Sequence, residues 1–328
     1  MSEREAAPTA TSPPVLDSLG ALPAARRVVT IGTFDGVHRG HRSLLGQTVA
    51  RARELGVPAL AVTFEPIPAL VLRPDRFAGR ICPPADKLLR IAEAGLDEIA
   101  VLAFTPELSR QTPEEFLGEL AERASPIEIW VGEAFALGKN RVGDVARIAE
   151  IGAGLGFAVR AVRRLENGTG VISSSAIRRA IQDGEVALAR TLLGRPFRVS
   201  GEVVHGAHLG RTIGYPTANV VPPPDLVPLA DGIYASWTTL PDGAGPRPAM
   251  TYVGTRPTVN TGDRLVETHL LDFDGDLYGQ VIHVDVLERL RPDATFAGLD
   301  ALVAQLRADE AATRAFLAIG QVASCDGG

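Results

Sequence analysis

Two histidines and three glycines lie close together near the N-terminus, in a segment that could bind phosphate. It reads Gly32-Thr33-Phe34-Asp35-Gly36-Val37-His38-Arg39-Gly40-His41. An apolar run ends where this segment begins and a helix pattern follows, so we expect a strand-to-helix junction. Free backbone N–H groups and the positive end of a helix dipole attract anionic oxygens at such a junction, and glycines let a polyphosphate approach closely. His38 and His41 could donate hydrogen bonds to a phosphoryl group during its transfer. The alternative is a glycine-rich turn with two surface histidines.

A second candidate for phosphate binding is the segment Ile172-Ser173-Ser174-Ser175-Ala176-Ile177-Arg178. It follows the last strand pattern of the N-terminal half and opens a helix pattern. Serine hydroxyls at a helix start, with an arginine one turn later, can cradle an anion. Taken alone, the serines could simply cap the helix. Taken with the histidine segment, Ser173, Ser174 and Arg178 predict the second end of a triphosphate clamp.

The C-terminal half contains a third candidate, Gly210-Arg211-Thr212-Ile213-Gly214-Tyr215-Pro216-Thr217-Ala218-Asn219. Thr217 and Asn219 carry hard oxygen ligands, and Mg²⁺ commonly takes one or two protein oxygens beside nucleotide phosphates. The glycines around Arg211 could let backbone amides close over phosphate. Glu267, in a later strand pattern, could accept a proton from a substrate hydroxyl during phosphoryl transfer. The alternative is an arginine- and glycine-containing loop with a solvated glutamate.

The elements that must position the first two candidates form an alternating pattern. Short apolar runs predict strands at residues 28–33, 59–64, 98–104, 127–132 and 157–162, with helix patterns between them. Thr112, Pro113 and Glu115 have the spacing of a capped helix start, and Gly56 supplies a helix stop. Repeated β-α-β units predict an open, doubly wound α/β sheet, whose ligands bind beyond the carboxyl ends of the strands.

After about residue 185 the pattern changes to strands separated by Gly, Pro and Asp clusters. Strands are expected at residues 199–204, 233–239, 249–253, 265–273 and 280–287, with no helix pattern between them. This arrangement predicts a small antiparallel β-barrel. Asp274-Gly275 predicts a tight hairpin turn between the last two strands. A terminal helix is expected from about Phe296 to Phe316, and the domain boundary in a helical bridge around residues 185–194.

Length and composition limit the class of protein. The chain has 328 residues, enough for about two domains, and a formal net charge of −6, which argues against nucleic acid or anionic lipid as a partner. Its two cysteines lie far apart in sequence, which suits a reducing cytoplasm. Residues 1–22 have no signal-peptide pattern and are expected to form a disordered tail, and no apolar run is long enough to span a membrane. We therefore expect a soluble cytoplasmic protein. The sequence does not predict its oligomeric state.

From about residue 27 to 318 the chain resembles the bacterial bifunctional riboflavin kinase/FAD synthetases. The histidine and serine segments look like the HxGH and ISSSxIR motifs of nucleotidylyltransferases, and residues 210–219 look like the kinase signature G-R-x-x-G-x-P-T-A-N. Four further segments follow in the family's order: Gly232-Ile233-Tyr234, Gly254-Thr255-Arg256-Pro257-Thr258, Glu267-Thr268-His269 and Leu277-Tyr278-Gly279.

The resemblance implies two activities. Residues 185–320 would form a riboflavin kinase domain that makes FMN with Mg²⁺ and ATP, using Glu267 as the base. Residues 23–184 would form an FMN adenylyltransferase (FAD synthetase) domain that transfers AMP from ATP to FMN and releases pyrophosphate. His38 and His41 would contact the nucleotide phosphates there, with Ser173 and Arg178 on the other side. The three motifs imply that the remaining substrate contacts are Gly32, Phe34, Asp35, Gly36, Gly40, Ser174, Gly210, Arg211, Gly214, Pro216, Thr217 and Asn219, with Thr217 and Asn219 also as Mg²⁺ ligands.

Two departures from the family pattern concern the first domain. Ile67 stands where the family usually has histidine in a Phe-x-Pro-His-Pro segment, and Ala134 stands where it usually has Asp or Asn before Phe135. Leu137 also replaces an aromatic residue. Losing one charge-assisted hydrogen bond costs roughly 1.5 to 3 kcal/mol, or one to two orders of magnitude in rate. Two alternatives therefore stay open: a riboflavin kinase with a slow or inactive adenylyltransferase domain, and a flavin-binding protein without turnover.

Overall fold

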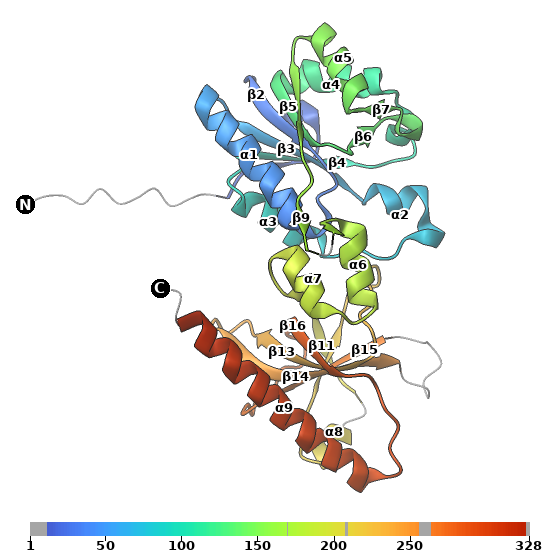
Figure 1. Cartoon of the computed structure of the whole chain (residues 1–328), viewed down its shortest axis with the longest axis vertical. Coiled ribbons are helices and arrows are strands. Elements are labelled where there is room, and N and C mark those ends of the chain that lie inside the picture. The colour runs from blue at the N-terminus through green and yellow to red at the C-terminus, as the bar shows by residue number, and fades with distance from the viewer. Residues whose placement is uncertain (1–11, 169, 207–208, 256–263, 326–328) are drawn as a thin grey trace, which may run out of the picture. The chain divides into compact units, whose positions relative to one another are not determined.

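The computed structural model describes residues 12–168, 170–206, 209–255 and 264–325. The chain forms two compact units (Figure 1). The first comprises residues 1–77 and 84–172, and the second comprises residues 78–83 and 173–328. The second unit thus starts upstream of residue 185, because helix α6 (Ser174–Gln182) packs against α7 (Val186–Leu193).

A six-stranded parallel sheet forms the centre of the first unit, in the order β1-β4-β3-β2-β5-β8. From β2 the chain proceeds through β3 to β4 on one side, and then crosses to β5 and β8 on the other. The strand order therefore reverses between β2 and β5. The strands are β1 (Val15–Leu16), β2 (Arg27–Ile31), β3 (Ala59–Glu65), β4 (Glu98–Ala103), β5 (Pro126–Gly132) and β8 (Ala158–Val162).

Helices cover both faces of this sheet, which confirms the doubly wound α/β prediction. Leu45 of α1 and Ile91 of α3 are buried against Val28 on one face. Leu120 of α4 is buried with Val29 on the other face, where α5 also packs. The helices are α1 (Arg39–Leu55), α2 (Pro68–Leu72), α3 (Pro84–Glu93), α4 (Pro113–Ala124) and α5 (Val145–Leu155). Two short ribbons, β6 (Ala136–Leu137) with β7 (Gly143–Asp144) and β9 (Glu166–Asn167) with β10 (Gly170–Val171), complete the unit.

The helix ends predicted from the sequence are present. Gly56 ends α1 in the left-handed conformation, with φ of 63°. The Thr112 side chain accepts from the Glu115 N–H, and the Glu115 carboxylate accepts from the Thr112 N–H, so the predicted capping box starts α4.

The N-terminal segment differs from the disordered tail that was expected over residues 1–22. Val15 and Leu16 form β1 and pair with β4, and Leu19 is buried in the core beside the sheet. The sequence of this segment has no regular strand or helix pattern, so these contacts could not be predicted from it. Residues 1–11 lie outside the described part of the chain.

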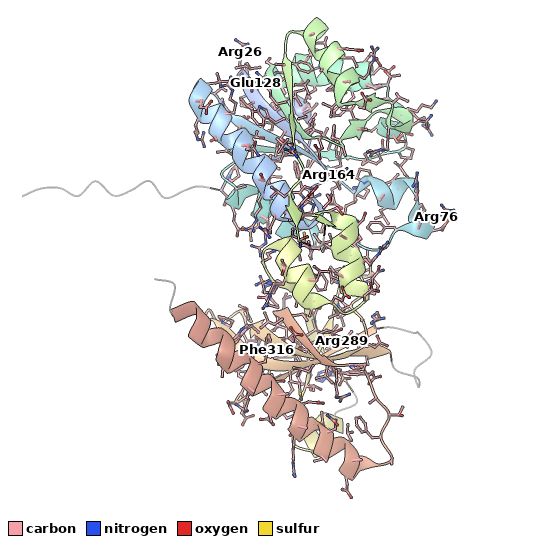
Figure 2. The ribbon with its side chains drawn as sticks, viewed as in Figure 1. Arg26, Arg76, Glu128, Arg164, Arg289 and Phe316 are labelled. Carbon is pink, nitrogen blue, oxygen red and sulfur yellow. The ribbon has the colours of Figure 1, made fainter. Side chains whose placement is uncertain are left out.

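A closed antiparallel barrel forms the second unit, in the order β11-β12-β15-β14-β13-β16. This confirms the predicted barrel. Its strands are β11 (Phe197–Val204), β12 (Ala218–Val221), β13 (Gly232–Thr239), β14 (Pro246–Thr255), β15 (Arg264–Leu270) and β16 (Val281–Arg291). The short helix α8 (Leu209–Thr212) precedes β12. The terminal helix α9 (Leu299–Cys325) packs on the barrel through Leu317 and Phe316 (Figure 2).

The predicted hairpin at Asp274-Gly275 is wrong. β15 pairs with β12 and β14, whereas β16 pairs with β11 and β13, so the two strands that flank the turn are not neighbours. Neither Asp274 nor Gly275 has a positive φ. Residues 271–280 instead connect strands on opposite sides of the barrel, which requires a longer loop. No described helix combines the length and the apolar character that crossing a membrane would require.

Candidate active sites

The histidine segment lies beyond the carboxyl end of β2, where the strand order reverses. Ligands bind at this point in doubly wound sheets. The 3-10 turn η2 (Asp35–Val37) follows the strand, and His38 is the N-cap of α1. The Thr63 hydroxyl of β3 donates to the Thr33 carbonyl over 3.1 Å, so the neighbouring strand holds the loop.

The His-x-Gly-His spacing has a direct structural reason. The His38 Nδ1 atom accepts from the backbone N–H of His41 over 3.2 Å, and the two rings stack with centroids 3.6 Å apart. A Cβ atom at Gly40 would lie only 3.2 Å from His38 Cε1 and 3.3 Å from Nδ1. Glycine at this position therefore leaves room for the stacked pair.

Two properties of the His41 side chain suit it for contact with a ligand: a buried ring nitrogen and a lowered pKa. Its Nδ1 atom is buried and has no hydrogen-bond partner among the described residues. Burial of the ring, and secondarily the charge of His38, hold the pKa of His41 well below its usual range. A buried ring nitrogen without a partner costs free energy unless a ligand satisfies it. A neutral imidazole still has one N–H to donate.

The three serines of the serine segment and Arg178 belong to the second unit. The Ser173 hydroxyl caps α6 by accepting from the Ala176 N–H over 3.2 Å, as the simpler interpretation of this segment predicted. Arg178 Nε donates to the Gly79 carbonyl over 2.6 Å. Because His38 and His41 belong to the first unit, joint binding of one triphosphate by both segments stays a prediction.

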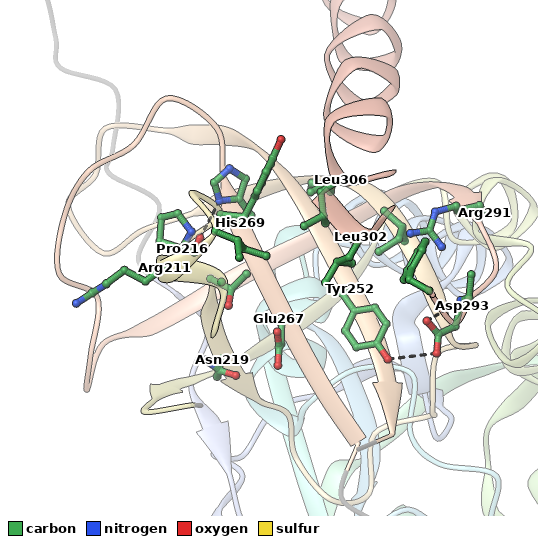
Figure 3. A pocket seen from close by; sticks show the side chains of 18 of the residues that line it. Arg211, Pro216, Asn219, Tyr252, Glu267, His269, Arg291, Asp293, Leu302 and Leu306 are labelled. Atoms are coloured by element: carbon green, nitrogen blue, oxygen red, sulfur yellow. Dashed lines mark hydrogen bonds between the residues drawn. The ribbon is translucent and has the colours of Figure 1, made fainter. Parts of the chain in front are cut away.

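A cavity of about 580 Å³ opens at one end of the barrel (Figure 3). Arg211, Thr217 and Asn219 of the predicted signature line one part of it, and Leu302 and Leu306 of α9 line another. A second cavity of about 610 Å³ shares Arg211, Pro216, Thr217 and Tyr278 with the first and continues along residues 273–278. The two cavities therefore meet at the signature loop.

Three neighbouring strands place three polar side chains in one row of the first cavity. Asn219 of β12 lies directly opposite Glu267 of β15, and Glu267 lies directly opposite Tyr252 of β14. Side chains of directly opposed residues point to the same face of a sheet, and Figure 3 shows Glu267 between the other two. The Asn219 Oδ1 atom is buried and lacks a hydrogen-bond partner within the described structure. The row brings together the predicted proton acceptor and one predicted metal ligand.

Two glycines and one histidine help to fix the signature loop, residues 210–219. A Cβ atom at Gly210 would lie 2.2 Å from the Tyr215 carbonyl oxygen, and Gly214 has φ of 85°. His269 Nδ1 lies 2.7 Å from the Pro216 carbonyl oxygen, so Nδ1 carries the proton and donates. No role was predicted for His269 from the sequence. Its position two residues after Glu267 on one strand could have indicated that both side chains share a face.

Other residues of the cavity carried no sequence signal. The Tyr252 hydroxyl donates to Asp293 Oδ2 over 3.3 Å, and burial together with the Asp293 carboxylate raises the pKa of Tyr252 to about 12. Arg291 forms an ion pair of 2.8 Å with the buried Asp309 of α9. These contacts hold α9 and the segment before it against the mouth of the barrel. Residues 256–258 of the predicted Gly254–Thr258 motif lie outside the described residues.

The two departures from the family pattern have different surroundings. Ile67 is only 3% exposed and lies at the start of α2. Ala134 is exposed in the turn after β5. Leu137 packs with Phe135 against the core of the first unit. Position 134 is therefore open to a polar side chain, whereas position 67 is not.

Both parts of the chain match known protein families. Residues 23–176 match the family model of FAD synthetase, and residues 193–317 match that of riboflavin kinase. The bifunctional riboflavin kinase/FMN adenylyltransferase of Escherichia coli (strain K12) is 38% identical over 305 residues, which cover 93% of this chain and 97% of the relative. The enzyme of the same name from Pseudomonas fluorescens is 39% identical over 293 residues, which cover 89% of this chain and 93% of the relative.

A crystal structure titled as a macrolide-efflux protein from Streptococcus pneumoniae has the same fold. It superimposes with a TM-score of 0.84 at 31% identity, over 93% of this chain and 99% of that chain. The similarity to the bifunctional enzymes extends over both units. The chain belongs to the bifunctional riboflavin kinase/FMN adenylyltransferase family.

Proposed function

We propose that this chain converts riboflavin to FMN in a kinase domain, residues 185–320, and FMN to FAD in an adenylyltransferase domain, residues 23–184, in the cytoplasm. One ATP is consumed at each step. The observation that carries the proposal is the pair Asn219 and Glu267, opposed across one strand ladder inside a cavity with an apolar wall.

In the kinase step, the Glu267 carboxylate accepts the proton of a riboflavin hydroxyl. The hydroxyl oxygen attacks the γ-phosphorus of ATP, the bond to the β-phosphate oxygen breaks, and ADP leaves. The apolar side chains of Ile213, Met250 and Leu302 suit the flat ring system of riboflavin in the first cavity. The second cavity is suited to the nucleotide, because it joins the first at Arg211 and Thr217, where the γ-phosphate must lie.

Asn219 and Thr217 would hold Mg²⁺. The unsatisfied, buried Oδ1 atom of Asn219 is a hard oxygen without another function in the described structure, and Thr217 lines both cavities. When bound, Mg²⁺ neutralises charge on the phosphates of the nucleotide. The remaining contacts expected from the signature are Gly210, Gly214 and Pro216.

In the adenylyl step, a phosphate oxygen of FMN attacks the α-phosphorus of ATP and pyrophosphate leaves, so no protein nucleophile is needed. His38 and His41 donate to the phosphate oxygens and stabilise the developing charge. Gly32, Phe34, Asp35, Gly36 and Gly40 shape this loop, and Ser173, Ser174 and Arg178 bind the nucleotide phosphates from the second segment. The buried Nδ1 atom of His41, which has no hydrogen-bond partner among the residues that the structure describes, supports the assignment.

A kinase with a slow adenylyltransferase domain is the second candidate. It is favoured by Ile67 and Ala134, where two polar side chains of the family pattern are missing.

The test is a time course with purified full-length protein, riboflavin, ATP and Mg²⁺, in which riboflavin, FMN and FAD are separated by chromatography. We expect FMN to appear first and FAD to follow. FMN that persists when FMN and excess ATP are supplied directly would establish the second candidate. Neither product would overturn the proposed function.

A further inference from the structure

A short segment of the chain leaves the unit to which its neighbours belong. Residues 78–83, here called the strap, belong to the second unit, although the chain before and after them belongs to the first. The sequence pattern of this segment predicted neither a strand nor a ligand contact. Its bonds within the second unit show what holds it there.

Arg80 fastens the strap to the loop that precedes β13. Its backbone N–H donates to the Asp225 carbonyl over 2.7 Å, and its carbonyl accepts from the Val227 N–H over 2.8 Å. Its Nε atom donates to Asp225 Oδ2 over 2.6 Å, with the Arg80 side chain only 6% exposed. Both the main chain and the side chain of Arg80 are therefore hydrogen-bonded to this loop.

Gly79 makes the close approach of the strap possible. A Cβ atom at this position would lie 2.5 Å from both the backbone nitrogen and the Cα atom of Val227, and its φ is 96°. Backbone atoms cannot move aside as the end of a side chain can. The strap therefore lies against this loop in one position, and the Gly79 carbonyl is held in a fixed place.

The Gly79 carbonyl accepts a hydrogen bond from Nε of Arg178, on α6, over 2.6 Å. A guanidinium group is planar and has five N–H donors. Fixing Nε therefore sets the plane in which the other donors point. A long side chain that is already oriented loses less conformational freedom when it binds phosphate.

We propose that Arg80 is a positioning residue for FMN adenylylation, which acts by holding Gly79 so that its carbonyl orients Arg178. The proposal rests on the proposed function, which assigns Arg178 to the nucleotide phosphates. Arg80 and Asp225 do not line either cavity of the barrel. We therefore expect the pair to serve the adenylyl reaction and to leave the kinase reaction unaffected, although both residues lie in the unit that contains the kinase barrel.

The two activities of one chain allow a test with an internal control. In full-length protein, Arg80→Met removes the ion pair and keeps the side-chain stem. We expect kcat for FAD formation from FMN and ATP to fall about tenfold, because small misplacements of a positioned group reduce rates strongly. FMN formation should stay within about twofold of wild type, which also shows that the second unit is folded. Arg76→Met, which changes an exposed arginine shortly before the strap, should leave both rates unchanged (Figure 2).

A double-mutant cycle tests whether Arg80 acts through Arg178. Arg178→Met alone should reduce FAD formation at least as much as Arg80→Met does, and the double variant should be no slower than Arg178→Met. Arg80→Lys keeps a charge within reach of Asp225 and should recover part of the rate.

Three results would overturn the proposal: an unchanged rate of FAD formation in Arg80→Met, an equal loss of both activities, or additive losses in the double variant. If wild-type protein forms no FAD at all, the proposed function fails, and this proposal fails with it. If wild type forms FAD and Arg80→Met does so equally well, only this proposal fails.

Discussion

Asn219 lies directly opposite Glu267 across the β12–β15 ladder, so the proposed metal ligand and the proposed proton acceptor are neighbours in the barrel cavity. The two residues are far apart along the chain, because two other strands, β13 and β14, lie between β12 and β15 in the sequence. The register of one strand pair therefore determines whether the kinase site exists. A variant of either residue should affect FMN formation and leave adenylylation of supplied FMN intact.

Glu267→Gln keeps the shape of the side chain and removes the base. We expect kcat for FMN formation to fall by about 10²- to 10⁴-fold, which is the contribution that a positioned base usually makes. The rate of FAD formation from supplied FMN should stay within about twofold. Glu202→Gln, an exposed glutamate of β11, is the matched control. An unchanged kcat for Glu267→Gln would contradict the assignment of the base.

Asn219→Leu should reduce the rate of FMN formation without reducing the stability of the protein. The Oδ1 atom is buried without a hydrogen-bond partner in the described structure, so its removal should not lower the melting temperature. FMN formation should fall at least tenfold and need more Mg²⁺ for half-maximal rate, because one metal ligand is lost. Calorimetry and a Mg²⁺ titration of the rate check both parts. A lower melting temperature with an unchanged Mg²⁺ requirement would show that Asn219 is structural.

Gly40→Ala should disturb the stacked histidines. Its Cβ atom would lie 3.2 Å from His38 Cε1, so the ring must move, and we expect FAD formation to fall at least tenfold while FMN formation is unchanged. Gly46→Ala in the same helix is the control, because its Cβ atom meets nothing within 4 Å. That control should increase stability by about 0.5 to 1 kcal/mol, the usual gain when alanine replaces glycine in a helix. Equal FAD formation by wild type and Gly40→Ala would contradict the role of the stacked pair.

His41 should make the first unit less stable in acid. The pKa of folded His41 lies well below 6.5, so the unfolded chain binds an additional proton once the pH falls below about 6.5. The contribution of His41 to the free energy of unfolding should therefore be constant above that pH and decrease as the pH falls toward the pKa of the folded state. Urea unfolding of wild type and His41→Asn at pH 7.5 and 5.5 measures this contribution. The decrease between the two pH values should be smaller in His41→Asn, and an equal decrease would be inconsistent with a lowered pKa of His41 in the folded protein.

Restoring the missing polar groups should give different results at the two positions. Ala134 is exposed, so Ala134→Asp should leave the melting temperature unchanged and increase the rate of FAD formation, by up to about tenfold for one added hydrogen bond. Ile67 is 3% exposed, so Ile67→His would bury an imidazole and lower the stability of the first unit by about 1 to 3 kcal/mol. Rates of FAD formation and thermal unfolding of both variants check this. No change in rate for Ala134→Asp would contradict a slow adenylyltransferase limited by that position.

Secondary-structure elements could be predicted from the sequence more accurately than the contacts between those elements. Apolar runs of the right length identified the long strands of the parallel sheet, because both faces of such strands are buried. β12 was missed, because it lies inside a segment rich in glycine and proline that was interpreted for its chemistry. The turn at Asp274-Gly275 was misassigned, because local turn preferences do not reveal which strands pair in a closed barrel.

Contacts between distant residues left no sequence signal. Lys87 is 2% exposed, and its ammonium group donates to the Phe64 carbonyl and to Glu65, although a lysine in a helix pattern is normally expected on the surface. The bond from Arg178 to Gly79 likewise joins residues 99 positions apart. Motifs could identify the residues that carry chemistry, but not the side chains and carbonyls that orient them.

One chain that performs two different transfers from ATP should give two different labelling patterns, and isotope labels distinguish the two transfers directly. Purified protein is incubated with riboflavin and Mg²⁺, once with ATP labelled at the γ-phosphate and once with ATP labelled at the α-phosphate, and the flavins are separated and counted. We expect the γ label to enter FMN and to stay in FAD, and the α label to enter FAD only. Flavins without either label would contradict this expectation, and so would α label in FMN.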